Sequence, residues 1–427
     1  MPDSAQTPRD ANKALLHASI VIIFGILATS LAQTQLLAII PLRNLLKNEL
    51  HVDRSANAAF FFWLTFPWFL KPIFGIVTDA FPLFGSRRRS YILISTSLTV
   101  LAWFAMIVTP HEYGKLLFVA LVINTFMMMA STVVGGYMVE TAQAISGSGR
   151  LSAIRMFVQQ GSYIISGPVA GFLASIAFGW TAAACGSIMF LLIPATIWFL
   201  HEQPSHVDSQ LLLDNARKQM GKIFTAGTMW AASGLLGLFY IAPGIQTAVF
   251  YRQQNDLHMN TQAQGILQML GGIGCVVAAV VYGFTCRRFN LRKLLVGCLF
   301  AGTLANLIYL FYSTPARAQA IETLNGFGYT LAELALMDLA VRATPRGSEG
   351  LGFALMMSVR NFALYGTDWI GSKMLDKYHL AFSTLVLSNA ATTAITIPLV
   401  FLLPLYIVRR KDAELVEEAA IPRAAVE

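Results

Sequence analysis

Long apolar runs separated by short polar segments fill most of the sequence. Each run holds about 20 residues, the length that an α-helix needs to cross the hydrocarbon core of a bilayer. The pattern predicts twelve membrane spans, over residues 16–41, 57–79, 90–109, 115–138, 151–176, 181–200, 223–247, 261–285, 292–312, 318–342, 349–371 and 380–407. We therefore expect an all-α polytopic membrane protein.

The spans fall into two sets of six, separated by the polar segment HEQPSHVDSQLLLDNARKQMGK. This division predicts an N-terminal six-helix bundle, a cytoplasmic linker, a C-terminal six-helix bundle and a cytoplasmic tail, over residues 1–200, 201–222, 223–407 and 408–427 respectively.

The two halves carry similar features at equivalent places. Gly75 near the end of span 2 and Gly283 near the end of span 8 each precede a basic loop. The acidic residues Glu140 and Asp338 lie towards the ends of spans 4 and 10. Internal repeats of this kind are typical of secondary transporters, which bind their solute near the midplane where the repeats meet. The pattern favours a transporter over an enzyme.

The composition agrees with a membrane protein. Hydrophobic residues make up 56% of the 427 residues and charged residues only 12%, whereas a soluble domain carries about 25% charged residues. The four cysteines show no paired spacing, so neither a disulfide framework nor a zinc site is expected. The first apolar run is longer than the core of a cleaved signal peptide, about 7–15 residues, and we interpret it as the first span.

The basic residues predict the orientation. Of the 30 Lys and Arg residues, 20 lie in the termini, in the loops on their side or at the span ends next to those loops, and eight lie in the same way on the opposite side. The remaining two, Lys71 and Arg360, lie deeper inside spans. Because cytoplasmic loops carry the excess of basic residues, we expect both termini in the cytoplasm and the protein in the plasma (inner) membrane of the cell. The charges are scattered in short clusters, which argues against a nucleic-acid-binding face.

Other chemistries find little support in the sequence. It contains no Gly-x-x-x-x-Gly-Lys-Ser/Thr loop, so ATP is not the expected energy source, and no cofactor is predicted. A polytopic membrane enzyme would need clustered acidic or histidine residues for metal or acid–base chemistry. The histidines in the loops are isolated, and we predict neither a catalytic residue nor a metal site.

The segment KPIFGIVTDAFPLFGSRRRSY, residues 71–91, joins spans 2 and 3. Gly75 has no side chain and lets a neighbouring helix approach closely. Asp79 lies one turn later on the same helix face, where a carboxylate can cap a facing helix or pair with the basic residues that follow, Arg87, Arg88 and Arg89. Breaking such contacts would release one half of a transporter from the other, so we interpret the segment as a latch.

This segment resembles the loop of the major facilitator superfamily, in which Gly-x-x-x-Asp is followed by Gly-x-Arg-Arg. Its Pro-Leu-Phe-Gly insertion, which ends at Gly85, is similar to that of the folate-biopterin transporter family. A second segment, PRGSEGLGFALMMSVRN (345–361), resembles that family at the start of helix 11 and includes Glu349 and Gly350. The resemblance implies twelve transmembrane helices in two six-helix repeats, and transport of a folate or pterin.

The resemblance also implies roles for the latch residues. In the superfamily, the loop aspartate caps helix 11, and an acidic residue at the end of helix 4 forms a charge relay with a loop arginine. These roles fall on Asp79, on Glu140 and on one of the three loop arginines, with Glu349 in the first turn of span 11. In the second half Arg287 stands in the place of the aspartate, so one acidic latch is expected. Asp338 can pair with Arg287 or with Arg288.

Few ionisable residues lie inside the predicted spans, where a charge is costly, and those present are functional candidates. Glu333 in span 10 is the first choice for a proton-binding site, and the alternative is a carboxylate neutralised by Arg360 in span 11. Arg360 can grip a substrate carboxylate through two hydrogen bonds, or serve only as the partner of Glu333; Asn361 follows it. Lys71 faces a cavity, or extends its stem to the cytoplasmic interface.

Neutral polar side chains add hydrogen-bonding groups within the spans. The candidates for solute contact are Gln33, Asn124 and Gln160, although such residues more often form helix–helix hydrogen bonds. The aromatic run AFFFWLTFPWFL, residues 59–70, offers either rings that stack on a flat pterin or a lipid-facing surface.

These features predict a secondary active transporter of a folate- or pterin-like organic anion that works by alternating access and is driven by protons. Its expected partners are the lipid bilayer, the solute and protons. A major facilitator transporter of another organic anion, a peptide fragment or a drug is the alternative, because a fold fixes the cargo poorly. A polytopic membrane enzyme is less favoured.

Overall fold

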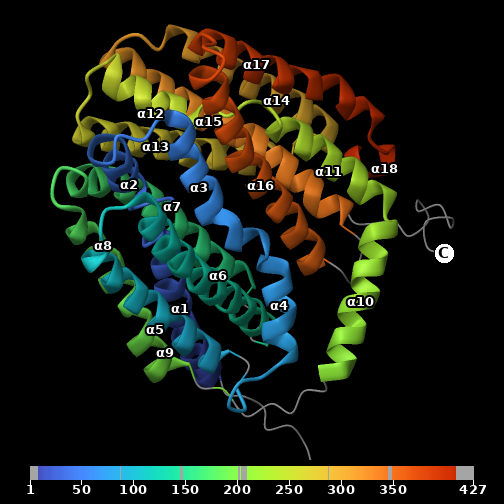
Figure 1. The fold of residues 1–427 in the computed structure, drawn as a ribbon. Coiled ribbons are helices and arrows are strands. Elements are labelled where there is room, and N and C mark those ends of the chain that lie inside the picture. Colours follow the sequence, from blue (N-terminus) through green and yellow to red (C-terminus); the bar gives the residue numbers. More distant parts are fainter. Residues whose placement is uncertain are drawn as a thin grey trace, which may run out of the picture. The chain divides into compact units, whose positions relative to one another are not determined.

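The computed structural model describes residues 8–86, 88–144, 148–200, 202, 209–286, 288–344 and 349–409. Over these ranges the regular secondary structure is helical (Figure 1), apart from an isolated antiparallel bridge between Leu83 and Ser86. The chain divides into two compact units. We call them unit 1, which is Met1–Ala216 with Asn260–Met269, and unit 2, which is Arg217–Met259 with Leu270–Glu427.

Unit 1 is built mainly from the first nine α-helices and one π-helix. They are α1 (Pro8–Leu31), α2 (Ile39–Asn44), η1 (Leu45–Glu49), α3 (Arg54–Phe69), α4 (Lys71–Ala80), α5 (Arg89–Val108), α6 (Tyr113–Ala144), α7 (Ser148–Leu173), α8 (Phe178–Phe190) and α9 (Leu192–Phe199). Helix α5 packs against α6 and α8, and α1 packs against α6 and α7. Trp103, Phe60 and Phe61 are completely buried between these helices, so large aromatic side chains fill the core of this unit.

Unit 2 contains the helices that follow. They are α10 (Ser209–Thr225, which begins in unit 1), α11 (Gly227–Tyr240), α12 (Gln246–Asn255), α13 (Thr261–Thr285), α14 (Leu291–Leu307), η2 (Ile308–Phe311), α15 (Pro315–Ala343), α16 (Glu349–Asp376), α17 (Phe382–Leu399), η3 (Val400–Leu402) and α18 (Leu405–Val408). The start of α13, up to Met269, belongs to unit 1. Helix α14 packs against α15 and α17. A Cβ on Gly328 would lie 2.6 Å from the Cβ of Ala305, so small residues let α14 and α15 approach closely.

Within the described ranges, each of the twelve predicted spans overlaps one helix or a short series of consecutive helices. Span 2 consists of α3 and α4, which meet at Leu70 directly before Lys71 and Pro72. Proline has no backbone N–H and disrupts the preceding turn of a helix, which explains the break at this position.

Span 7 is shorter than the predicted range of 223–247. Helix α11 ends at Tyr240, because Pro243 and Gly244 interrupt the helix before α12 begins at Gln246. The preceding segment, which we expected to be a linker, contains most of α10, and α10 meets α11 at a bend of 71°.

Seven helices or consecutive helix pairs in the described part of the chain are long and apolar enough to cross a membrane, and the bent pair α10 and α11 would make an eighth. Helices α15 and α16 are less apolar because they carry ionisable side chains, including Glu322, Glu333, Asp338, Arg360 and Asp368. The ionisable residues that make these two helices less hydrophobic are therefore also the candidate functional residues.

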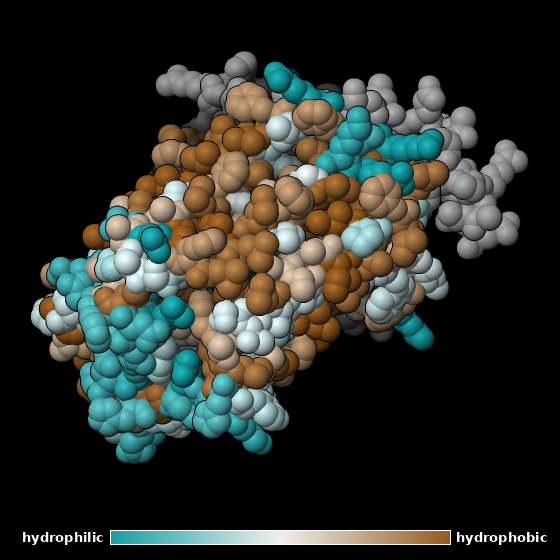
Figure 2. Space-filling model, turned by 90° about the horizontal axis from the view of Figure 1, so that it is seen from above, coloured by the Kyte–Doolittle hydropathy of each residue, from teal (hydrophilic) through white to brown (hydrophobic). Residues whose placement is uncertain are grey.

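The surface exposes many large apolar side chains, among them Trp198, Phe118, Leu101, Phe172 and Trp230. Figure 2 shows hydrophobic residues over most of the face in view, with hydrophilic residues gathered towards its ends. Exposed apolar patches on this scale are rare on soluble monomers and mark surfaces that contact lipid or partners.

Candidate functional site

Glu333 on α15 forms an ion pair with Arg360 on α16, within unit 2. The hydroxyl of Tyr240, at the end of α11, joins both side chains. It accepts a hydrogen bond from Arg360 Nε at 2.9 Å and donates one to Glu333 Oε1 at 3.0 Å. Three helices thus contribute to one closed group of acid, base and hydroxyl, which we call the Glu333 cluster.

The guanidinium of Arg360 is almost fully used inside the Glu333 cluster. Its Nη2 contacts Glu333, its Nε donates to Tyr240, and its Nη1 donates to the side-chain oxygen of Asn361 at 3.0 Å. Its Cζ also lies 5.3 Å from the centre of the Tyr240 ring. A solute carboxylate would have to displace one of these partners. The geometry therefore favours Arg360 as the counter-ion of Glu333 over Arg360 as a free anion-binding group.

Aromatic rings enclose the Glu333 cluster. The ring of Tyr329 lies 6.5 Å from that of Tyr240 and 5.5 Å from that of Phe239, between centroids. The side chains of Glu333 and Arg360 each keep 22% of their exposed surface, so the pair is neither sealed nor freely solvated.

Asn124 on α6 is the centre of a polar cluster in unit 1. Its side-chain oxygen accepts a hydrogen bond from the indole of Trp68 at 3.0 Å, and its nitrogen donates to the hydroxyl of Thr34 at 3.0 Å and to the carbonyl of Ala120 at 2.9 Å. Gln35 links this cluster to Thr65 on α3. Asn124 is completely buried, and its bonds are those expected of a residue that holds helices together.

The other neutral candidates of unit 1 differ in how they are bonded. Gln33, just beyond the end of α1, donates to the carbonyl of Thr29 in the last turn of that helix at 2.6 Å. Gln160 on α7 is half-buried and has no hydrogen bond to any described residue. The structure thus brings Asn124 into a network, and it leaves Gln160 available.

Lys71 lies at the break between α3 and α4, where the sequence places its Lys-Pro pair. Its ammonium group donates to the hydroxyl of Ser131 at 3.3 Å and lies 5.3 Å from the centre of the Trp68 ring. Lys71 therefore points towards α6, which carries Ser131, beside the Asn124 cluster.

The loop after α4 forms a tight hairpin turn. Leu83 and Ser86 exchange two backbone hydrogen bonds of 3.0 Å, and the two residues between them, Phe84 and Gly85, have positive φ angles of 52° and 75°. Two consecutive positive φ angles are typical of a type I′ turn, in which glycine carries no steric penalty. The predicted latch glycine, Gly85, thus has a conformational reason to be a glycine.

Glu202, just beyond α9, organises the end of this turn and was not among our predicted site residues. Its carboxylate accepts hydrogen bonds from the hydroxyl of Ser86 at 2.6 Å and from the backbone N–H groups of Arg88 and Arg89, each at 3.0 Å. A carboxylate at a helix N-terminus satisfies free N–H groups and complements the helix dipole. Its signal in the sequence was slight, because it is one acidic residue in a polar segment.

The latch arginines take different positions. Arg88 is buried, and its guanidinium lies against Gly136 on α6. A Cβ on Gly136 would lie 2.9 Å from Arg88 Cζ. Gly136 precedes Glu140 by one helical turn. Arg89 donates to the carbonyl of Ile197. Gly75 on α4 faces Thr132 on α6. A Cβ on Gly75 would lie 3.7 Å from the side-chain methyl carbon of Thr132.

Several predicted latch residues fall outside the described part of the chain. Arg87 and Arg287 lie outside the described residues, as do the side chains of Asp79, Glu140 and Glu349 and the surroundings of Gly350. The backbone of Asp79 lies in the last turn of α4, and that of Glu140 lies near the end of α6. The backbones of Glu349 and Gly350 form the start of α16. Their proposed contacts stay predictions.

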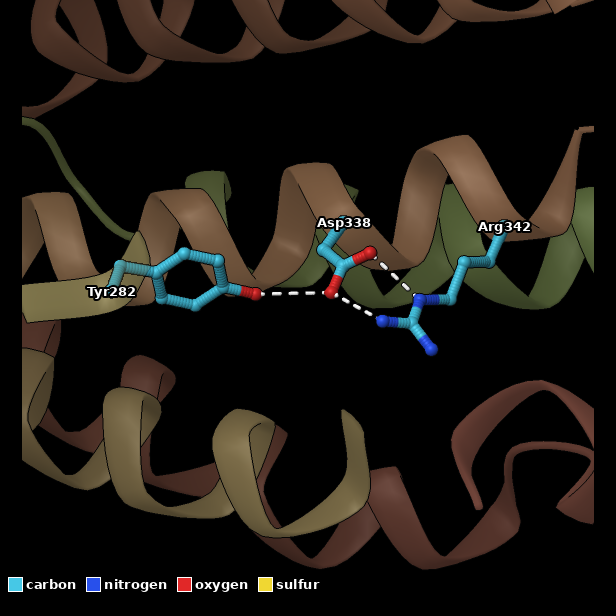
Figure 3. A network of polar contacts seen from close by, with 3 residues as sticks. All are labelled: Tyr282, Asp338 and Arg342. Carbon is cyan, nitrogen blue, oxygen red and sulfur yellow. Dashed lines mark hydrogen bonds and ion pairs between the residues drawn. The ribbon is translucent and has the colours of Figure 1, made fainter. Parts of the chain in front are cut away.

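Asp338 on α15 pairs with Arg342, one turn further along the same helix (Figure 3). Arg342 Nε lies 2.7 Å from one carboxylate oxygen, and a terminal nitrogen lies 2.9 Å from the other. The hydroxyl of Tyr282 on α13 also donates to this carboxylate at 3.2 Å. Sequence reasoning missed Arg342 because a loop partner seemed the natural one, although an i, i+4 pair was visible in the sequence.

Asp368 on α16 is buried and holds the break between α11 and α12. Its carboxylate accepts hydrogen bonds from the backbone N–H of Thr247 at 3.0 Å and from the Thr247 hydroxyl at 2.6 Å. The N–H of Gly244 donates to the carbonyl of Thr367 at 2.8 Å. Asp368 therefore caps the start of α12, and its contacts are those of a residue with a structural role.

No group of three or more His, Cys, Asp or Glu residues that could bind a metal ion occurs among the described residues. The ionisable clusters described above consist of acid, base and hydroxyl groups.

A family model described as the BT1 family matches residues 33–420. The chain is 24% identical over 389 residues to the folate-biopterin transporter of Synechocystis sp., covering 84% of this chain and 76% of the relative. It is 20% identical over 344 residues to folate transporter 1 of Plasmodium falciparum, covering 77% and 67% of the two chains.

Solved structures show the same fold. A mutant of the nucleoside transporter NupG superimposes with a TM-score of 0.69 at 13% identity, covering 91% of this chain and 99% of that one. The D-xylose-proton symporter superimposes with a TM-score of 0.68 at 13% identity, covering 93% and 98%. These likenesses confirm the predicted major facilitator fold of twelve membrane helices in two six-helix repeats.

Proposed function

The chain belongs to the BT1 family, and on that premise we propose that it is a secondary active transporter of a folate- or pterin-like organic anion. The observation that carries the proposal is the similarity, over about three quarters or more of this chain, to proteins named folate-biopterin transporter and folate transporter. The likeness to NupG and the xylose symporter supports the fold alone, and a fold does not select the cargo. The protein is a transporter rather than an enzyme.

Transport would proceed by alternating access, in which two repeats move so that the solute site opens first to one side of the membrane and then to the other. We place both termini in the cytoplasm and the protein in the plasma membrane, because of the distribution of Lys and Arg among the loops.

Protons would drive accumulation through the Glu333 cluster. With Glu333 ionised, its charge holds Arg360, and Tyr240 links the two. With Glu333 protonated, Arg360 loses its counter-ion and can take another partner, so the cluster has two states that a proton selects. The support for this step is the position of an acid, a base and a hydroxyl on three different helices of one unit.

Uptake into proteoliposomes tests the proposal. Labelled folate, labelled biopterin and an unrelated organic anion are offered with and without an inwardly directed proton gradient. We expect saturable uptake of folate or biopterin that is stimulated by the gradient and inhibited by the unlabelled compound. If neither compound is taken up or competes, while the unrelated anion accumulates, the substrate assignment is wrong.

A further inference from the structure

We propose that the end of α10 and the start of α11 bind the headgroups of anionic phospholipids at the surface of the membrane. The residues that would form this binding surface are Arg217, Lys218, Lys222, Phe224 and Trp230, all within unit 2. We call these five residues the α10 surface. The inference adds a partner to the protein and does not depend on which solute it transports.

Helix α10 is strongly bent relative to the span that follows it. Helix α11 belongs to the seventh predicted span, and α10 turns away from its N-terminal end at an angle of 71° (Figure 1). Membrane helices are tilted by about 20° on average from the bilayer normal. A helix at 71° to such a span therefore runs closer to the membrane plane than to the normal. With both termini in the cytoplasm, as proposed above, α10 lies at the cytoplasmic surface, where the leaflet carries anionic lipids.

The exposed side of α10 is positively charged. Arg217, Lys218 and Lys222 are exposed, and none of them forms an ion pair or a hydrogen bond with a described residue. The same holds for Asp214, the one acidic residue in the sequence of this helix, although it lies one turn before Lys218. Lys218 and Lys222 lie one turn apart on the same face, a spacing at which like charges repel each other. A phosphate group bound to both would replace this repulsion by attraction.

Two exposed aromatic side chains lie at the junction of the helices. Phe224 at the end of α10 is 58% exposed and Trp230 on α11 is 57% exposed, and their ring centroids lie 6.1 Å apart. The indole N–H of Trp230 donates to the backbone carbonyl of Phe224 at 2.9 Å. Ile223, the residue before Phe224, is buried in the core of unit 2. The end of α10 is thus held to the protein on one side and exposes the aromatic pair on another.

Cations and exposed aromatic rings on a helix near the membrane plane are the features of a helix at a membrane interface. Tryptophan in particular is enriched at the level of the headgroups, where its ring meets apolar groups and its N–H meets polar ones. Free phosphate offers the same charge to the basic side chains, but it makes no use of the aromatic pair. A phospholipid satisfies both halves of the α10 surface, with its phosphate at the cations and its acyl chains at the rings.

Quenching of Trp230 fluorescence by brominated phospholipids tests the α10 surface. The protein is reconstituted in phosphatidylcholine vesicles that contain increasing fractions of brominated phosphatidylglycerol or, in a parallel series, of brominated phosphatidylcholine. The Trp230 component is the difference between the wild type and Trp230→Phe, and its dependence on the lipid fraction gives the relative affinity for the two lipids. We expect a preference of about fivefold or more for phosphatidylglycerol, which is the contribution of one basic residue near an anionic surface.

Two triple variants, each measured with its own Trp230→Phe counterpart, decide whether the preference comes from α10. Arg217→Gln/Lys218→Gln/Lys222→Gln removes the three charges, keeps both aromatic rings and retains a good helix former at each position. The preference should then fall to about one. The control is Arg317→Gln/Lys373→Gln/Lys377→Gln, which removes three exposed basic side chains elsewhere in unit 2 and should keep the preference.

A wild-type protein that shows no preference overturns the proposal, as does a preference that survives in the α10 variant. Loss of the preference when excess inorganic phosphate is added at constant ionic strength also overturns it, because the site would then bind free phosphate rather than a lipid. Since the measurement is fluorescence and not uptake, each of these outcomes leaves the proposed function untouched.

Discussion

The carboxylate of Glu333 forms an ion pair with the guanidinium of Arg360, and the Tyr240 hydroxyl is bonded to both. We predict that Glu333→Gln abolishes the accumulation of solute driven by a pH gradient, because glutamine has the shape of the protonated acid but cannot release a proton. Exchange of labelled for unlabelled solute should continue. Both rates are measured in the same proteoliposomes.

Glu322, on the same helix, provides the matched control. It accepts hydrogen bonds from the hydroxyls of Tyr309 and Tyr312 at 3.1 and 3.0 Å, and it forms no ion pair with a described residue. We expect Glu322→Gln to retain accumulation driven by the gradient. The opposite result, with loss in Glu322→Gln and retention in Glu333→Gln, would move the proton site to Glu322.

Gly136 and Gly135 are adjacent on α6 and offer a clean comparison. A Cβ on Gly136 would meet the buried guanidinium of Arg88, whereas a Cβ on Gly135 would meet no atom within 4 Å. Both substitutions gain the same helix propensity, about 1 kcal/mol for Gly→Ala. We therefore predict that Gly136→Ala slows transport by displacing Arg88, and that Gly135→Ala does not.

The rates are compared at equal amounts of folded protein in the membrane. Equal transport by the two alanine variants would show that the position of Arg88 does not matter for the cycle. Slower transport by Gly135→Ala alone would contradict the contact with Arg88.

The sequence predicted the positions of the spans well, because a membrane helix needs a run of about 20 apolar residues and soluble segments seldom contain one. It also placed Glu333 and Arg360 on neighbouring spans and proposed their ion pair. Tyr240 could not be foreseen, because its place beside the pair depends on how α11 packs against α15 and α16.

Partners that come from distant segments were harder to predict. Glu202 contacts the start of α5 although it lies in a polar segment more than 100 residues later in the sequence. No local sequence pattern predicts such a contact. Single side chains at the ends of helices acquire their roles from tertiary structure.

Glu202 should stabilise unit 1 by capping α5. Removing its carboxylate in Glu202→Ala leaves the N–H groups of Arg88 and Arg89 without their acceptor, and we expect a loss of about 1–2 kcal/mol. Thermal unfolding in detergent measures the effect as a lower melting temperature. Glu112→Ala, which removes an exposed ion pair with Lys115, is the control and should change stability by less than about 1 kcal/mol. Equal melting temperatures for the two variants would contradict the capping role.

Asp368 and Thr247 should be energetically coupled. Asp368→Asn weakens the acceptor for the Thr247 N–H and hydroxyl, and Thr247→Val removes the hydroxyl, so each leaves a buried polar group unsatisfied at a cost of about 1–3 kcal/mol. The double variant should lose less than the sum of the single variants, with a coupling of about 0.5–3 kcal/mol. Thermal unfolding of the four proteins gives this value.

Thr392→Val is the matched control for this cycle, because the hydroxyl of Thr392 donates to a carbonyl of its own helix. Combined with Asp368→Asn, it should give strictly additive losses, since the two residues share no described contact. Additivity in the Thr247 cycle as well would mean that Asp368 is held mainly by its other partners. A measurable coupling confined to Thr247 shows that Asp368 fixes the start of α12, and with it the end of the helix that carries Tyr240.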